Sequence, residues 1–238
     1  MTQTRTAALL VLVLAVAFAS SSVVFPFAGF EPDAFPIPQN DPPAQPAGYA
    51  FSIWLVIYLW LILSAAYGVF RRAENPEWAA TRGPLLLSLG IGMFWLAAAS
   101  QSPLLATVMI WAMLLSAVVA LARSPVTDRW LLRGPIGLYA GWLAAASCVS
   151  IALVGAGYGI AFSQTTWAFV VVIAATLGAL GVIGWLGRVP EFGLAVAWAL
   201  IAVAVKSAHS EPLLALTAGL SAAAVGVVVT LRETSTRA

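Results

Sequence analysis

The sequence predicts an all-α integral membrane protein, a polytopic bundle of about eight transmembrane helices. Of its 238 residues, 62% are hydrophobic and only 8% are charged, whereas soluble domains average about 45–50% and 25%. Eight crossings of about 20 residues each use about 160 residues and leave no room for a soluble second domain. The runs are apolar without strand-like alternation, which favours helices because lipid offers no partner to a free backbone N–H or C=O.

Charge and proline bound the first four predicted spans. They are residues 7–25, 48–70, 84–100 and 103–122. The first follows Arg5 and stops at segment 26–47, which holds seven of the fourteen prolines and cannot form a regular helix. The second stops at Arg71, the third begins beyond Arg82, and Pro103 separates the third from the fourth.

The last four predicted spans have similar limits. They are residues 135–155, 165–186, 191–206 and 212–231. The fifth begins after Arg133, the sixth ends before Arg188, the seventh ends at Lys206, and the eighth begins at Pro212. We expect the eight spans to form one membrane domain.

Small residues at spacing four predict helix contacts, because close approach in lipid depends on them. Gly137 and Gly141 supply this spacing in the fifth span, and Ala215, Gly219 and Ala223 supply it in the eighth. The spacing leaves open whether these faces pack within the bundle or form a homodimer.

The distribution of charge predicts the orientation. With eight spans, ten of the eleven basic residues lie on the side of the two termini, and Lys206 alone lies on the other. The positive-inside bias therefore places both termini in the cytoplasm. Ala17-Phe18-Ala19 resembles a signal-peptidase site, but we expect residues 1–19 to be retained because the apolar run continues to Phe25.

Composition also excludes function classes. One cysteine, Cys148, and one histidine, His209, do not make a metal cluster or an intrachain disulfide. The basic residues form no stripe, so we expect no nucleic-acid partner. No charged residue lies in the middle of a span, which disfavours an ion-coupled carrier. An enzyme is the least favoured class, with no catalytic residues assigned, and a ligand-binding protein or an uncoupled facilitator of a lipophilic molecule remains.

An aromatic pattern opens the second span. Phe51, Trp54 and Tyr58 are three and four residues apart, so they share one helix face and form an aromatic wall. Tyr139 and Trp142 in the fifth span can supply the opposite wall. Such a slot suits a flat, hydrophobic ligand.

Two motifs carry a family resemblance. The order P-x-G-x-x-F-x-x-W-x-x-x-Y from Pro46 to Tyr58, and Pro135, Tyr139, Trp142 and Ala146 in the fifth span, resemble the TspO/MBR family of tryptophan-rich sensory proteins, related to the translocator protein. Trp95 is a weaker third match. The resemblance covers residues 1–155 and implies that they form a five-helix core of the membrane domain. Residues 156–238 form a three-helix extension similar to that of longer bacterial members, which implies a bacterial cytoplasmic membrane. Gly92 and Ser150 stand where the family often has asparagine, which implies a less polar pocket.

The resemblance implies a cavity at the outer mouth of the bundle that binds a porphyrin-like tetrapyrrole or similar lipophile, with dimers in relatives. The ligand-binding residues that we carry over are Pro46, Phe51, Trp54, Tyr58, Trp95, Tyr139, Trp142 and Ala146. We expect no required cofactor. A bound porphyrin would have no axial iron ligand, because no histidine lies within the spans.

Segment 26–47 has two interpretations: its aromatic residues tuck it onto the outer mouth of the bundle, or it is a stiff connector at headgroup level. The aromatic and aliphatic residues concerned are Phe25, Phe27, Phe30, Phe35 and Ile37.

Lys206 is the one basic residue on the outer side, where it either reaches the membrane surface or has a functional partner. In the functional hypothesis Lys206 pairs with a ligand carboxylate or with Glu31, Asp33 or Asp41 to close the loop.

Overall fold

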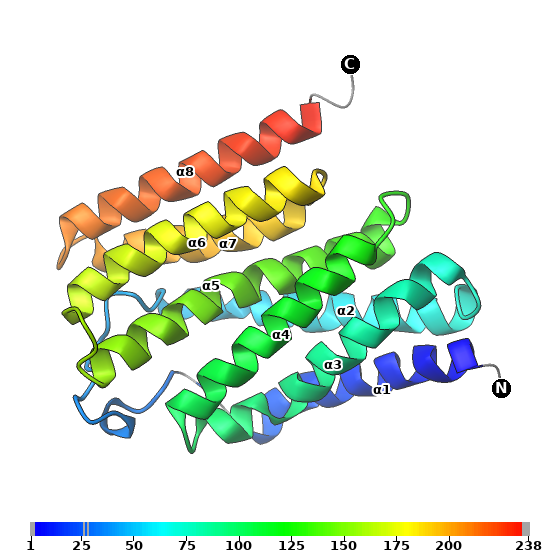
Figure 1. Ribbon diagram of the computed structural model, residues 1–238, viewed down its shortest axis with the longest axis horizontal. Helices are drawn as coiled ribbons and strands as arrows, with labels where there is room; N and C mark the ends of the chain where they lie inside the picture. The colour runs from blue at the N-terminus through cyan, green and yellow to red at the C-terminus, as the bar shows by residue number, and fades with distance from the viewer. Residues whose placement is uncertain (1–2, 26, 28, 235–238) are drawn as a thin grey trace.

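The computed structural model describes residues 3–25, 27 and 29–234, and over these residues it confirms an all-helical bundle (Figure 1). The long helices are α1 (Gln3–Val24), α2 (Ile53–Arg71), α3 (Pro76–Ala99), α4 (Pro103–Arg123), α5 (Gly134–Gly157), α6 (Gln164–Leu186), α7 (Pro190–Ser207) and α8 (Pro212–Thr234). Eight segments of the described chain are long and apolar enough to cross a membrane. Short turns η1 (Pro32–Ala34) and η2 (Gly48–Ser52) and the π-helical turn η3 (Arg129–Arg133) complete the description.

The second predicted span, expected from residue 48, does begin there, with its first turn in η2 and the rest in α2. The third predicted span begins at the wrong residue. The third was expected from residue 84, but α3 begins at Pro76, because Asn75 Oδ1 accepts a hydrogen bond from Trp78 N at 3.1 Å and proline suits the first helical position. Hydropathy missed the first turns of α3 because they contain charged residues.

The centre of the bundle is formed by α5 and α7, which are the most buried spans. Helix α5 contacts α2 and α4 on one side and α6 and α7 on the other, and α8 packs on α7 and α6. Figure 1 shows α5 between the group α1–α4 and the group α6–α8. The last three helices therefore pack directly on the core and extend one continuous bundle.

A close approach of α5 and α7 occurs at Gly141. A Cβ at this position would overlap the backbone carbonyl of Phe192, whereas a Cβ at Gly137 would lie 3.5 Å from Phe192 N in ordinary contact. The predicted small-residue face of the fifth span is therefore a contact within the bundle.

The predicted face of the eighth span, Ala215, Gly219 and Ala223, is not a contact within the described bundle. Ala223 is exposed, and a Cβ on Gly219 would meet open space. Helix α8 instead buries the face formed by Leu214, Ala218, Ala222, Val225 and Val229. The homodimer stays a prediction.

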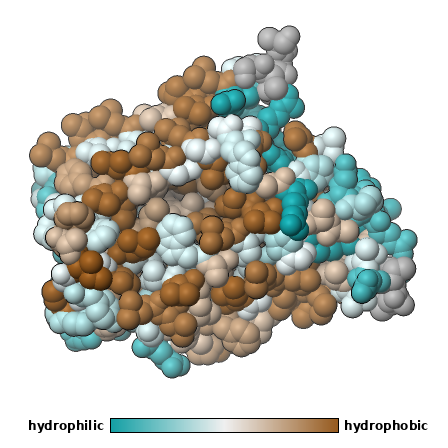
Figure 2. Space-filling view, in the orientation of Figure 1, coloured by the Kyte–Doolittle hydropathy of each residue, from teal (hydrophilic) through white to brown (hydrophobic). Residues whose placement is uncertain are grey.

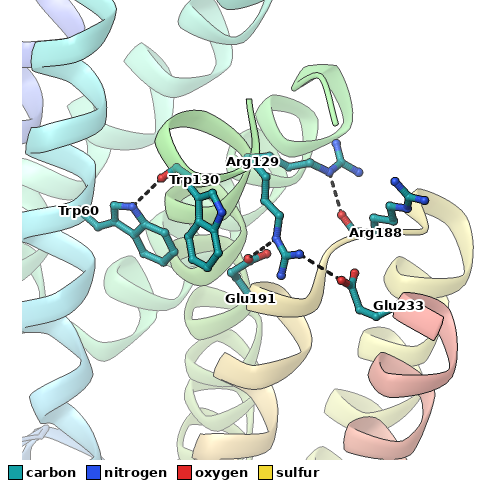
Figure 3. Close-up of polar contacts among 7 residues, drawn as sticks. Trp60, Arg129, Trp130, Arg188, Glu191 and Glu233 are labelled. Atoms are coloured by element: carbon teal, nitrogen blue, oxygen red, sulfur yellow. Dashed lines mark hydrogen bonds and ion pairs between the residues drawn. The ribbon is translucent and has the colours of Figure 1, made fainter. Parts of the chain in front are cut away.

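Figure 2 shows mostly apolar residues across the middle of the face in view, and hydrophilic residues gathered at the end where α1 begins and α8 ends. At this end the side chain of Arg129 lies 2.8 Å from Glu191 and 3.0 Å from Glu233, joining the α4–α5 connection to α7 and α8 (Figure 3). Trp60 Nε1 also donates to the backbone carbonyl of Trp130 at 2.7 Å.

Arg133 caps two helices at the same end of the bundle. Its buried guanidinium donates to the carbonyls of Leu121 (3.2 Å) and Ser124 (2.6 Å) at the end of α4, and of Leu186 (3.0 Å) at the end of α6. Its Nε donates to the carbonyl of Arg188 at 2.9 Å. These contacts satisfy carbonyls that a helix end leaves free.

Candidate functional site

The proline-rich segment folds back over one end of the bundle. Phe35 is buried, and the rings of Phe27 and Phe30 pack against each other with centroids 5.4 Å apart, while Ile37 stays half exposed. The backbone attaches the segment to helices, since Ile37 N donates to the carbonyl of Gly157 at 2.9 Å. Among the described residues, the tucked-in arrangement is therefore the one present.

An aromatic cavity of about 320 Å³ lies beneath this segment. We name it the aromatic slot; its lining is Phe18, Ser22, Phe25, Phe27, Phe51, Trp54, Leu55, Tyr58, Trp95, Leu96, Ile110, Met113, Trp142, Leu143 and Ala146. These residues come from α1, the loop, η2 and α2 to α5. The volume is at the lower end of the range of about 300–1,000 Å³ for small-molecule sites.

The rings of the slot contact one another in defined geometries. Trp54 stacks on Tyr58 with centroids 5.1 Å apart and planes 18° apart, as expected for one helix face. Trp142 meets Trp54 edge to face at 6.3 Å and Phe51 at 5.9 Å. The second and fifth spans therefore supply adjoining aromatic walls.

Six of the eight predicted residues line the slot: Phe51, Trp54, Tyr58, Trp95, Trp142 and Ala146. Tyr139 does not line it. Its fully buried ring packs behind Phe18 at 5.9 Å, and its hydroxyl is hydrogen-bonded to Ser88 Oγ at 2.9 Å. Tyr139 thus supports the wall from behind, whereas Pro46 lines a neighbouring cavity.

The sequence analysis missed Phe18 as a site residue. Its ring is edge to face with Tyr58 at 5.1 Å and with Trp54 at 5.7 Å. Gly92 makes room for it, since a Cβ there would lie 2.9 Å from the Phe18 ring. The sequence offered one signal for Phe18, its place in Ala17-Phe18-Ala19, and this tripeptide resembles a signal-peptidase site. The signal therefore indicated cleavage of the chain and not ligand binding.

The described lining of the slot carries no charged side chain. Trp95 Nε1 donates to the carbonyl of Ala106 at 2.8 Å, which fixes this indole and uses its donor. The hydroxyls of Ser22 and Tyr58 and the other indole N–H groups are the remaining polar groups. Such a lining suits a flat apolar body whose charged substituents stay outside, because an unpaired buried charge is costly.

Lys206 holds the loop to α7. Its Nζ lies 2.8 Å from Asp41 Oδ1 and donates to the carbonyl of Pro42 at 3.1 Å. Of the three predicted acidic partners, Asp41 is therefore the one in contact, and Glu31 and Asp33 lie exposed on the loop. The role of this contact as a gate stays a prediction.

The fold and the slot together define a polytopic helical membrane protein with an aromatic cavity near one end of its bundle. The chain matches the family described as TSPO-like protein over residues 5–231 and belongs to this family. The match includes α6, α7 and most of α8, beyond the 1–155 segment that carries the motifs. No curated protein and no solved structure matches the chain.

Proposed function

We propose that this protein is a membrane ligand-binding or sensory protein that holds a flat hydrophobic molecule, of porphyrin-like or similar shape, in the aromatic slot. The observation that carries the proposal is the convergence of Phe51, Trp54, Tyr58, Trp95 and Trp142 on one cavity of about 320 Å³. Stacked and edge-to-face aromatic contacts favour planar partners by about 0.5–1.5 kcal/mol per pair beyond area burial.

The uncharged lining of the slot bears on the orientation of such a ligand. No charged side chain lines the described slot, and Lys206 on the loop side already pairs with Asp41. A ligand with carboxylates would insert its ring edge first and keep the carboxylates toward the loop and the water. The volume of the slot implies that part of a tetrapyrrole stays in the mouth.

Titration of the protein in nanodiscs with protoporphyrin IX tests the proposal. Binding is followed by tryptophan quenching and independently by porphyrin absorbance, for the wild type, Trp54→Leu and Trp142→Leu. Trp185→Leu is the matched control, because Trp185 is 69% exposed on the outside of the bundle.

We expect saturable binding that weakens at least tenfold in each slot variant, since each loses stacking and cavity contacts of about 1.5 kcal/mol or more. The control should bind like the wild type. Equal loss in all three variants, or no saturable absorbance change, would refute the proposal.

A further inference from the structure

A second cavity adjoins the aromatic slot. We name it the side chamber; it has a volume of about 80 Å³ and shares Phe27, Phe51, Trp95, Ile110, Trp142 and Ala146 with the lining of the slot. The shared residues place the two cavities side by side, with the Phe51–Trp142 edge-to-face pair at their common wall. A ligand in the slot would therefore have the side chamber next to its edge.

The far wall of the side chamber comes from α6 and α7. Val171, Val172 and Ala175 line it from α6, and Ala199, Leu200 and Val203 line it from α7. Two of the three C-terminal helices, α6 and α7, thus contribute to a cavity at the site, although none of their residues lines the slot itself.

The chemistry of the side chamber selects its occupant. Apart from indoles, its described polar side chains are Gln45, Cys148 and Ser150, and none is charged. Its volume is about half of the 150 Å³ of an apolar cavity that holds benzene. The space therefore fits about two or three carbon atoms and disfavours a carboxylate, which would be left without a partner.

We propose that the side chamber is a specificity pocket that takes a short aliphatic substituent of the ligand whose ring system occupies the slot. This inference rests on the proposed function, because it needs a flat ligand in the slot. It adds that the ligand carries a two- or three-carbon alkyl or vinyl group at one edge, and that residues of α6 and α7 contact this group and select for it.

Three porphyrins that differ only at two ring positions test the inference: deuteroporphyrin IX with hydrogen, protoporphyrin IX with vinyl and mesoporphyrin IX with ethyl. Dissociation constants are measured in nanodiscs, with the concentration of porphyrin free in water as the reference. They are compared for the wild type, Ala175→Leu and Ala199→Leu. Both alanines are buried and line the side chamber from different helices, so leucine at either position fills it. Ala174→Leu is the control, because Ala174 precedes Ala175 but is exposed.

In the wild type and the control we expect mesoporphyrin to bind about fifteenfold more tightly than deuteroporphyrin, since each of the two carbon atoms of a buried ethyl group contributes about fourfold. In the two filling variants this preference should vanish, while the affinity for deuteroporphyrin stays unchanged and shows that the slot is intact. A wild-type preference that both filling variants retain would overturn the inference and leave the proposed function standing. Equal affinities of the wild type for all three porphyrins would also overturn the inference and leave the proposed function standing. If no porphyrin binds the wild type, the proposed function falls and the inference falls with it.

Discussion

Substitution of two glycines one helical turn apart should have different effects on stability. Gly141→Ala places a Cβ against the backbone carbonyl of Phe192, which cannot move aside as the tip of a side chain can. Helices α5 and α7 would then have to separate along their central contact. Gly137→Ala places its Cβ 3.5 Å from Phe192 N, an ordinary contact distance.

The magnitude follows from two terms. Both substitutions gain about 0.5–1 kcal/mol because alanine favours the helix over glycine. Only Gly141→Ala has the overpacking cost of about 1–3 kcal/mol. The two variants should therefore differ by about 1–3 kcal/mol, with Gly137→Ala at or above the wild type and Gly141→Ala below Gly137→Ala.

Thermal unfolding in detergent, followed by a thiol-reactive fluorophore, measures this difference. Cys148 is the one cysteine of the chain and lies in α5, so the dye reports exposure of the central helix. At about 2–4 °C per kcal/mol for a chain of this size, the two melting temperatures should differ by about 2–12 °C. Equal melting temperatures would show that α5 and α7 do not pack at Gly141 as described.

Three further predictions concern the ends of the bundle and the chain. Arg133→Leu leaves the carbonyls at the ends of α4 and α6 without their donor. Because a hydrogen bond to a charged group contributes about 1.5–3 kcal/mol, this variant should lower the melting temperature by at least about 5 °C. Arg123→Leu is the control and should have little effect, because Arg123 is exposed. Intact-mass measurement should find residues 3–24 in the membrane-inserted protein, because Phe18 is buried in the slot; a mass that begins after Ala19 would contradict this. The C-terminus should lie in the cytoplasm, because the basic residues of the described chain other than Lys206 lie at the end of the bundle where α1 begins. A C-terminal fluorescent-protein fusion should therefore fluoresce and an alkaline phosphatase fusion should be inactive; an active phosphatase would contradict the predicted orientation.

The spans could be predicted from the sequence because apolar length and boundary charges are local properties. Phe51, Trp54 and Tyr58 could be predicted as slot residues because their spacing fixes one helix face. Trp95, Trp142 and Ala146 could be predicted from the family resemblance. Phe18 could not, since α1 is apolar on all sides and its sequence does not indicate which face turns inward. The Lys206–Asp41 pair was only one of three options, because a loop of this length brings several carboxylates within reach of one lysine.

Helices α6 and α7 determine where the loop lies over the slot. Ala47 N donates to the carbonyl of Ala202 at 3.2 Å, and Trp198 Nε1 donates to the carbonyl of Ala50 at 3.0 Å. Together with the Lys206–Asp41 pair, these contacts fix both ends of the stretch that leads into η2.

Gln164 Nε2 on α6 adds a hydrogen bond to Gln39 Oε1 at 3.0 Å. Since η2 carries Phe51, the position of one wall of the slot depends on helices that do not line the slot. A substitution at Trp198 should therefore alter ligand binding through the position of Phe51, although its indole does not line the cavity. A chain that ended after α5 would lack all of these contacts, so its loop and Phe51 would have to be held by other residues.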